Sequence, residues 1–403
     1  MCNILLVSER QAILRYNFRL RPGKIAETKL ISEWHASRWV WNQCVAIGNQ
    51  AYQNFKTGVE NKSPTFCRMS KKLTEWRAEH EWLRNCSQVP QQQTVRNWSQ
   101  AYQSAFKQPS KGWPKFKSSK VAKPTLEYTS RGFSIKNGVL KLAGKISVPI
   151  VWSRELPSEP KTVTITQDAE GHWNASFVVR RDKEEFPDSE QGVGIDWGVS
   201  KVANTDKGKD FDLECGNQIS ETASVLKKAQ RKLSKAQKGS RGRIKARKRV
   251  ARIHLKRVRQ RKDRAFKWAR KIVTNFGYIA IENFKPKFLA KSKMAKKASD
   301  GAVGMTKDIL IKMAEQAGRT IALVDAAYTT MTCANCGTRA KERLPLSQRI
   351  FKCACGYEAG RDLNAARVIL AKAGFDLADV EAVRLNHSSG CLSGLSQESP
   401  CFS

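Results

Sequence analysis

The sequence predicts a multidomain α+β protein in which a small β-barrel carries a helical insertion and precedes an α/β unit. The chain has 403 residues, against roughly 150 per domain. Helical spacing of apolar residues dominates before Pro114, and short alternating strands follow it. Beyond Gln191, short apolar runs alternate with long helical segments, which is the pattern of an α/β unit.

The first two elements are a short strand and a helical region. Tyr16 to Leu20 reads as a strand, and residues 25–111 as helical. One face of the clearest helix carries apolar residues at steps of three and four; these are Val95, Trp98, Tyr102 and Phe106. Seven of the eleven tryptophans lie between Trp34 and Trp113, where they either fill a helical core or stack on nucleic-acid bases.

Two β-hairpins follow the helical region. In the first, Asn137-Gly138 separates the runs Phe133–Lys136 and Val139–Leu142, and Asn-Gly between alternating runs is a strong hairpin signal. The second has a turn at residues 168–171 between two alternating runs. We expect these strands and the first strand to form the barrel, into which the helical region is inserted.

The α/β part consists of apolar strands separated by helices. The expected strands are Gly192–Trp197, Tyr278–Ile281 and Ile321–Val324, and the expected helical segments are residues 221–271, 306–318 and 362–374. Thr306 could cap the middle helix and Gly318 could end it. A Lys-rich loop is expected at residues 284–304.

The charge of the chain indicates a polyanionic partner. It has 73 Lys and Arg against 36 Asp and Glu, a net charge of +37, and residues 227–271 hold 22 basic residues against a single acid, Asp263. Nucleic acid and anionic membrane are the usual partners, although a basic run can also be only a solvated face. No apolar stretch approaches the ~20 residues of a membrane span, so we expect no membrane association and a protein that stays in the cytoplasm where it is made.

Three acids stand in ordered, apolar settings. Asp196 follows Gly192-Val193-Gly194-Ile195, Glu282 follows Tyr278–Ile281, and Asp362 starts the last helix. Converging carboxylates repel one another unless divalent cations neutralise them, and Mg²⁺ prefers oxygen ligands. Two such ions clamp the attacking and leaving oxygens of a phosphoryl displacement, so metal-dependent phosphodiester hydrolysis is the chemistry that these acids predict. Alternatively, Asp362 is only an N-cap, and Asp196 and Glu282 face water at strand ends.

Four cysteines have the spacing of a zinc ribbon. Cys333-Ala-Asn-Cys336-Gly is followed, after sixteen intervening residues, by Cys353-Ala-Cys355-Gly. Two close pairs on tight turns, with no histidine nearby, predict a closed, structural Cys₄ site for one Zn²⁺. The alternative is four free thiols.

Together these motifs resemble the TnpB family of transposon-encoded proteins and the related miniature type V CRISPR effectors. The motifs that carry the resemblance occur in the family's order; they are Pro114-Lys-Phe-Lys117, Gly194-Ile-Asp-Trp-Gly198, Ile281-Glu-Asn283, the cysteine pairs and Arg361-Asp-Leu-Asn-Ala-Ala-Arg367. Cys353-x-Cys355 is tighter than the Cys-x-x-Cys that many members carry.

The resemblance implies a wedge-type β-barrel with an inserted helical recognition domain, followed by a RuvC (RNase H-like α/β) nuclease domain interrupted by the Cys₄ zinc ribbon. The corresponding boundaries are residues 1–24 and 112–187 for the barrel, 25–111 for the helical domain, 188–328 and 358–384 for the nuclease, 329–357 for the ribbon and 385–403 for a disordered tail.

The resemblance also implies an activity, RNA-guided and Mg²⁺-dependent cleavage of double-stranded DNA next to a short flanking motif. Asp196, Glu282 and Asp362 would be catalytic and would hold Mg²⁺, two ions in all, while Cys333, Cys336, Cys353 and Cys355 hold zinc. The implied partners are a guide RNA, with one protein monomer per guide, and target DNA. The resemblance further implies a prokaryotic, nucleoid-associated protein. Two alternatives remain: a nuclease-silent RNA-guided repressor, and an RNA-independent transposase or resolvase.

Overall fold

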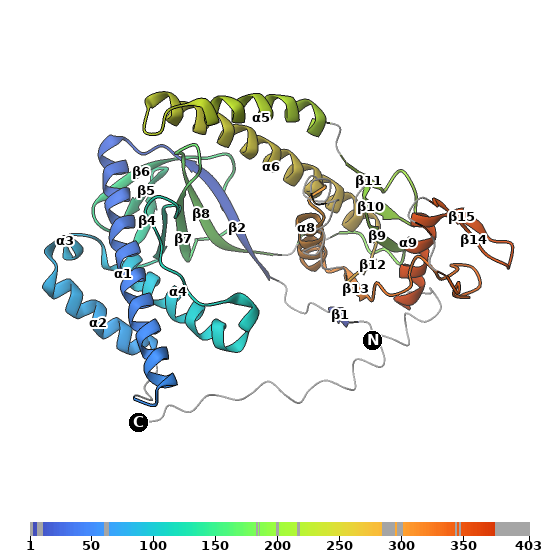
Figure 1. The fold of residues 1–403 in the computed structure, drawn as a ribbon, viewed down its shortest axis with the longest axis horizontal. Coiled ribbons are helices and arrows are strands. Elements are labelled where there is room, and N and C mark those ends of the chain that lie inside the picture. Colours follow the sequence, from blue (N-terminus) through green and yellow to red (C-terminus); the bar gives the residue numbers. More distant parts are fainter. Residues whose placement is uncertain are drawn as a thin grey trace. The chain divides into compact units, whose positions relative to one another are not determined.

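The computed structural model describes residues 3–5, 11–59, 64–182, 184, 186–198, 201–215, 218–283, 295, 301–342, 345 and 348–374. The chain forms two compact units (Figure 1). The first unit is Gln11–Asp182, and the second contains residues 3–5 and the described chain from residue 184 onward.

The first unit is built on a seven-stranded antiparallel sheet that curls into a barrel-like form (Figure 1). The strand order is β3-β7-β8-β2-β6-β5-β4. The strands are β2 (Gln11–Leu20), β3 (Thr125–Thr129), β4 (Phe133–Lys136), β5 (Val139–Leu142), β6 (Ile146–Val151), β7 (Thr162–Gln167) and β8 (Trp173–Asp182). Buried residues alternate with exposed ones along β6 and with half-buried ones along most of β8, so that one face of the sheet encloses an apolar core.

Both predicted hairpins are present. In the first, Asn137 and Gly138 have φ of 51° and 75°, which is the positive-φ pair that a two-residue turn between twisted strands requires. The second joins β7 to β8 with register Gln167↔Trp173. The residues of each turn were therefore enough to predict where these two hairpins form.

The helical region lies between β2 and β3, as predicted. Its elements are α1 (Lys24–Lys56), α2 (Phe66–Glu79), α3 (Glu81–Arg84), α4 (Gln88–Lys107) and the 3₁₀ turn η1 (Pro109–Lys111). Trp98 is fully buried between these helices, whereas Trp82 is 47% exposed. Phe106 is 51% exposed, so the apolar face predicted for α4 is buried only as far as Tyr102.

The second unit contains a six-stranded mixed sheet of order β1-β13-β12-β9-β10-β11. The strands are β1 (Asn3–Leu5), β9 (Gly192–Trp197), β10 (Lys201–Thr205), β11 (Leu213–Glu214), β12 (Tyr278–Glu282) and β13 (Thr320–Val324). β9, β12 and β13 are parallel, and the other three strands pair antiparallel. The three parallel strands were predicted, whereas the short strands β1, β10 and β11 were not.

Residues 3–5 lie in the second unit, whereas the predicted boundary assigned residues 1–24 to the barrel. They pair with Ile321–Leu323 at the edge of the six-stranded sheet. The physical reason is that β13 has a second edge with unpaired backbone groups, and an antiparallel partner satisfies them.

Helices cover both faces of this sheet. The apolar side of α6 (Arg241–Asn275) and that of α8 (Val303–Gln316) pack on one face with Val193, Ile195 and Ile281. The helix α9 (Arg361–Lys372) packs on the opposite face against Ala280 and Ala322. Because side chains alternate along a strand, even-numbered residues of β9 and β12 face α9.

The strongly basic residues 227–271 lie in two helices, α5 (Gln218–Lys235) and α6. Gly239, with φ of 85°, allows the break between them, and the Ser240 hydroxyl caps α6 by accepting from the Arg243 amide at 3.1 Å. Among the apolar residues of α6, Trp268 is buried, whereas Ile244 and Val258 are 46% and 48% exposed. None of the helices in the described part of the chain has the length and apolar character of a bilayer span.

The helix α8 begins earlier than predicted. Its N-cap is Ala302, at φ of 52°, and the Thr306 hydroxyl donates to the Ala302 carbonyl from inside the helix, so the prediction that Thr306 caps this helix was wrong. Gly318 follows its end with φ of 66°, as expected. Most of the predicted Lys-rich loop at 284–304 and the whole predicted tail at 385–403 lie outside the described residues.

Candidate active site

Asp196 and Glu282 lie next to each other at the C-terminal ends of the adjacent parallel strands β9 and β12. Ile281 of β12 is in register with Ile195 of β9, and each acid is the residue that follows. The side chains are only 8% and 9% exposed. The alternative in which these acids merely face water at strand ends is therefore wrong.

Asp362 approaches the same face of the sheet from α9. The contact that brings the helix close is at Gly194, where a Cβ atom would overlap the backbone oxygen of Ala366. Gly194 and Asp196 share one face of β9, and Asp362 is one helical turn before Ala366. The N-cap of α9 is Gly360, so the alternative of Asp362 as N-cap is also wrong.

The electrostatics of Asp196 link the three acids. Burial raises the pKa of Asp196 well above its usual value, the charges of Glu282 and Asp362 raise it further, and Arg361 opposes them. Arg361 Nε is 3.7 Å from Asp362 Oδ1. Asp196 is thus near enough to both of the other carboxylates to be repelled by them, and a cation between them would relieve that repulsion.

Glu282 is in a second electrostatic network that the sequence analysis missed. Burial raises its pKa to about 7; the Lys307 ammonium opposes this, and the Asp325 carboxylate adds to it. Lys307 Nζ also donates to the Glu282 carbonyl at 3.0 Å. Asp325 could have been recognised, since it directly follows the apolar strand β13 just as Glu282 ends β12.

The acids are less tightly grouped than a preformed metal cage. Among the described residues, two groups of ligand atoms lie within 4.8 Å of one another, and neither contains Asp196. One is the four cysteines, and the other is Asp168, Glu170 and His172 on the β7–β8 turn. In the latter, His172 Nδ1 lies 3.6 Å from Asp168 Oδ2 and 3.9 Å from Glu170 Oε2, which is accounted for by ion pairing within the turn.

The four cysteines that the sequence predicted form a compact cluster. Cys333 Sγ is 3.8 Å from Cys355 Sγ, and Cys336 Sγ is 3.6 Å from Cys353 Sγ. A tetrahedral Zn²⁺ site with bonds of about 2.3 Å spaces its sulfurs about 3.8 Å apart. Gly337 and Gly356, with φ of 72° and 86°, close the two turns. The donor set and its spacing therefore fit zinc.

The cysteine cluster is fastened to the helix that carries Asp362. Asn364 is fully buried; its side chain accepts from the Ala334 amide at 2.9 Å and donates to the Thr332 carbonyl at 2.8 Å. The strands β14 (Ile350–Lys352) and β15 (Glu358–Gly360) complete the ribbon and lead directly into α9. The ribbon thus braces the start of α9 beside Asp362.

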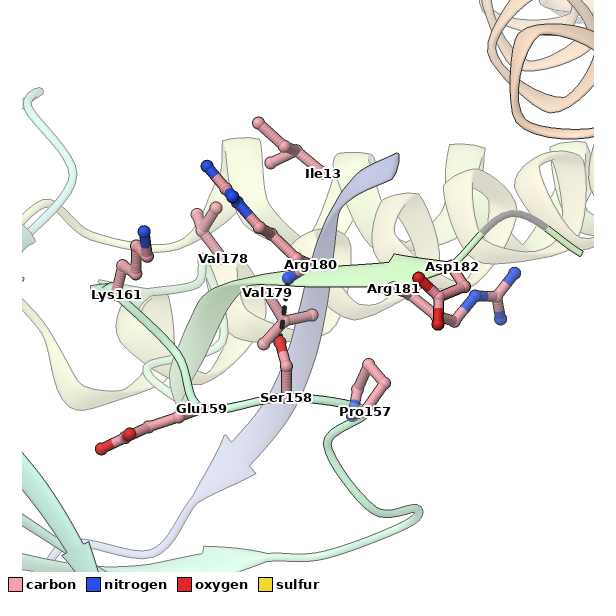
Figure 2. Close-up of a pocket in the computed structure, with 10 residues that line it drawn as sticks. All are labelled: Ile13, Pro157, Ser158, Glu159, Lys161, Val178, Val179, Arg180, Arg181 and Asp182. Carbon is pink, nitrogen blue, oxygen red and sulfur yellow. Dashed lines mark hydrogen bonds between the residues drawn. The ribbon is translucent and has the colours of Figure 1, made fainter. Parts of the chain in front are cut away.

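The first unit has a separate, open cavity of about 600 Å³ at the ends of β2 and β8 (Figure 2). Figure 2 shows Arg180 rising beside Ile13, with Arg181 and Asp182 farther along the strand. Ile13 and Arg180 are cross-strand partners, and Ser158 Oγ accepts from the Arg180 amide at 3.0 Å. None of the residues that line this cavity belongs to the acidic site or to the cysteine cluster.

Comparisons with known proteins identify the family. A family model described as "Probable transposase" matches residues 176–293, and one described as "Cas12f1-like, TNB domain" matches residues 304–369. The chain is 32% identical over 364 residues to a Streptomyces pristinaespiralis protein named "Putative RNA-guided DNA endonuclease", covering 88% of each chain.

Two further matches extend over nearly the whole chain. An Escherichia coli K12 protein named "Putative RNA-guided DNA endonuclease InsQ" is 29% identical, with 92% of this chain and 94% of that protein covered. A solved Cas12f1 chain, from a complex with sgRNA and target DNA, has a TM-score of 0.53 at 13% identity and covers 90% of this chain and 99% of its own. The fold is thus that of a Cas12f-type effector, and the resemblance drawn from the motifs is confirmed: the chain belongs to the TnpB family.

Proposed function

We propose that this protein is an RNA-guided, Mg²⁺-dependent endonuclease that cuts double-stranded DNA next to a short flanking motif with a single RuvC-type site. The observation that carries the proposal is the convergence of Asp196, Glu282 and Asp362 on one face of the sheet, in a chain with net charge +37. Asp196 and Glu282 are buried, and Asp362, whose side chain is 34% exposed, lies beside Asp196 in the first turn of α9. The similarity to proteins named as RNA-guided DNA endonucleases, and to Cas12f1 in a complex with sgRNA and target DNA, supports RNA and DNA as the partners.

The three acids would hold Mg²⁺, with two ions in the complete site. When bound, such ions stabilise the attacking and leaving oxygens of an in-line phosphodiester hydrolysis. Asp196 and Glu282, held by adjacent strands, supply rigid oxygen ligands, while Asp362 is set by α9. The raised pKa values of Asp196 and Glu282 support this role, because a buried acid that resists ionisation alone becomes a good ligand once a cation shares the site.

The cysteine cluster would hold one structural Zn²⁺ through Cys333, Cys336, Cys353 and Cys355. Four thiolates leave no open position for substrate. Its contribution to cleavage is then indirect: through Asn364 it fixes the first turn of α9 and therefore Asp362.

A plasmid assay tests the proposal. The protein is purified, the RNA that accompanies it is sequenced, and the matching target is cloned beside a randomised flank. We expect double-strand cleavage with Mg²⁺ that EDTA abolishes, and cleavage confined to a subset of flanks. The variant Asp196→Asn should bind RNA and DNA without cutting, whereas the control Asp263→Asn, at an exposed acid that pairs only with Lys267 in the described chain, should cut normally.

Other outcomes identify the two alternatives. RNA-dependent DNA binding without cleavage by the wild-type protein would indicate a nuclease-silent repressor. Full cleavage by RNA-free protein would indicate a transposase or resolvase. Normal cleavage by Asp196→Asn would remove that residue from the site.

A further inference from the structure

The segment of residues 111–123, here called the Phe116 segment, connects the helical insertion to β3 within the first unit. It contains five lysines and no Asp or Glu; the lysines are Lys111, Lys115, Lys117, Lys120 and Lys123. The segment has almost no regular secondary structure. Such a concentration of one charge repels itself unless a polyanion lies against it.

Despite its charge, the segment is held firmly on α1. Trp41 Nε1 donates to the Lys115 carbonyl at 2.9 Å, and the Lys117 carbonyl accepts from Arg38 at 3.1 Å and from Asn42 at 3.2 Å. The Asn42 side chain also accepts from the Lys117 amide at 2.8 Å. Four side-chain bonds within three residues remove most of the conformational freedom that a loop would otherwise lose on binding.

Phe116, which lies between the two residues whose backbone groups are bonded to α1, points away from the protein. Phe116 is 60% exposed, while the peptide groups of the residue before it and the residue after it are fixed to α1. The Lys117 ammonium lies 3.4 Å from the centre of the Trp41 ring, which also holds that side chain on the helix. A rigid backbone thus presents an aromatic ring to solvent between two lysines.

We propose that Phe116 stacks on an unpaired base of the guide RNA, while lysines of the Phe116 segment contact the neighbouring phosphates. This rests on the proposed function, which supplies the RNA. Aromatic rings beside cationic groups form the stacking platforms of proteins that bind single-stranded nucleic acid. A single exposed phenylalanine is ordinary; its combination with five lysines, no acids and a fixed backbone is what indicates a base and its phosphates.

RNA is the partner whose bases can stack on the exposed Phe116 ring at the lowest cost. The bases of duplex DNA are paired and stacked, so placing one on Phe116 would first cost a few kcal/mol of unstacking. Folded RNA already presents unpaired bases in loops, bulges and ends, and proteins commonly stack aromatic side chains on them. The occupant is therefore assigned as RNA.

Phe116→Ala tests the proposal against a matched control, Phe55→Ala. Both phenylalanines are 60% exposed and both lie in the first unit, so their loss should affect folding equally little. The probe is the RNA that copurifies with the wild-type protein, transcribed and labelled. We expect Phe116→Ala to weaken binding of this RNA by about 5- to 150-fold, Phe116→Trp to restore it, and Phe55→Ala to leave it unchanged.

Ultraviolet cross-linking of the wild-type complex, followed by mass spectrometry, gives an independent readout. We expect an RNA adduct on the peptide that contains Phe116. Wild-type RNA affinity in Phe116→Ala would overturn this inference while leaving the proposed function intact. A loss confined to target-DNA binding would overturn the assignment to RNA. Absence of RNA binding by the wild-type protein would instead overturn the proposed function itself.

Discussion

Gly194 of β9 and Ala366 of α9 meet backbone to backbone, closely enough that a methyl group on Gly194 would overlap the Ala366 carbonyl. This contact sets the distance between strand β9, which carries Asp196, and helix α9, which carries Asp362. Neither Gly194 nor Ala366 has a polar side chain, yet together they position two of the three candidate catalytic acids.

Gly194→Ala should therefore separate α9 from the sheet. We expect the free energy of unfolding to fall by about 3 kcal/mol and cleavage to be lost, as measured by urea denaturation and the plasmid assay. Gly242→Ala is the control, because Gly242 lies in α6 with its nearest foreign atom, Ser240 Oγ, at 3.7 Å from an added Cβ. That change should stabilise the helix by about 0.5–1 kcal/mol. Equal stability of Gly194→Ala and wild type would contradict the contact.

Asn364→Ala should uncouple the cysteine ribbon from α9. It leaves the Ala334 amide and the Thr332 carbonyl without their present partner, at a cost of about 2–4 kcal/mol. Zinc content should stay unchanged while cleavage falls, because the cysteines remain and only the brace on Asp362 is lost. Asn275→Ala, at an exposed residue whose side chain donates to the Lys271 carbonyl at 2.8 Å, should cost less than about 0.5 kcal/mol.

Cys353→Ser should remove the proposed zinc. Elemental analysis is expected to find one Zn²⁺ per wild-type chain and none in this variant, with local unfolding of the ribbon seen as faster proteolysis. Cys67→Ser changes an exposed free cysteine outside the cluster and should retain the metal. Equal zinc in Cys353→Ser and wild type would exclude a Cys₄ site.

Glu33 should make the stability of the first unit depend on pH. Burial raises the pKa of this α1 residue to about 7, even though the Ser87 amide donates to its carboxylate at 2.8 Å. A raised folded-state pKa means that the folded chain binds the proton more tightly, so stability is greatest below the ordinary pKa of 4.5 and falls as pH rises toward about 7.

Glu33→Gln should flatten that dependence. The wild-type protein is expected to lose on the order of 3 kcal/mol between pH 4.5 and pH 7 relative to the variant, measured by urea denaturation at several pH values. Glu81→Gln, which changes an exposed acid, should follow the wild-type curve. A parallel decline in Glu33→Gln would show that other groups carry the dependence.

Local chemistry made much of this fold predictable. Asn137-Gly138 dictates its own turn because few other residue pairs tolerate two consecutive positive φ values, and the alternating runs on either side become β4 and β5. Likewise, cysteine spacing alone predicted the four-sulfur cluster, since ligands on two tight turns need little help from the rest of the chain.

Strands without a clear alternation of apolar and polar residues were not predicted from the sequence. The pairing of Asn3–Leu5 with β13 joins residues more than 300 positions apart. Nothing local in three residues distinguishes an edge strand of the second unit from a continuation of the barrel. Asp325 has a local signal, because it directly follows the apolar strand β13, but its effect on Glu282 depends on the pairing of β13 with β12.

From the sequence alone came the three candidate acids, the four clustered cysteines, the hairpins and the family, because each depends on residue type and spacing along the chain. Only the tertiary structure decided that Asp196, Glu282 and Asp362 share one face, since that depends on parallel register between β9 and β12 and on the close approach of α9 at Gly194. Register and helix packing arise from contacts between distant segments, and no local pattern encodes them.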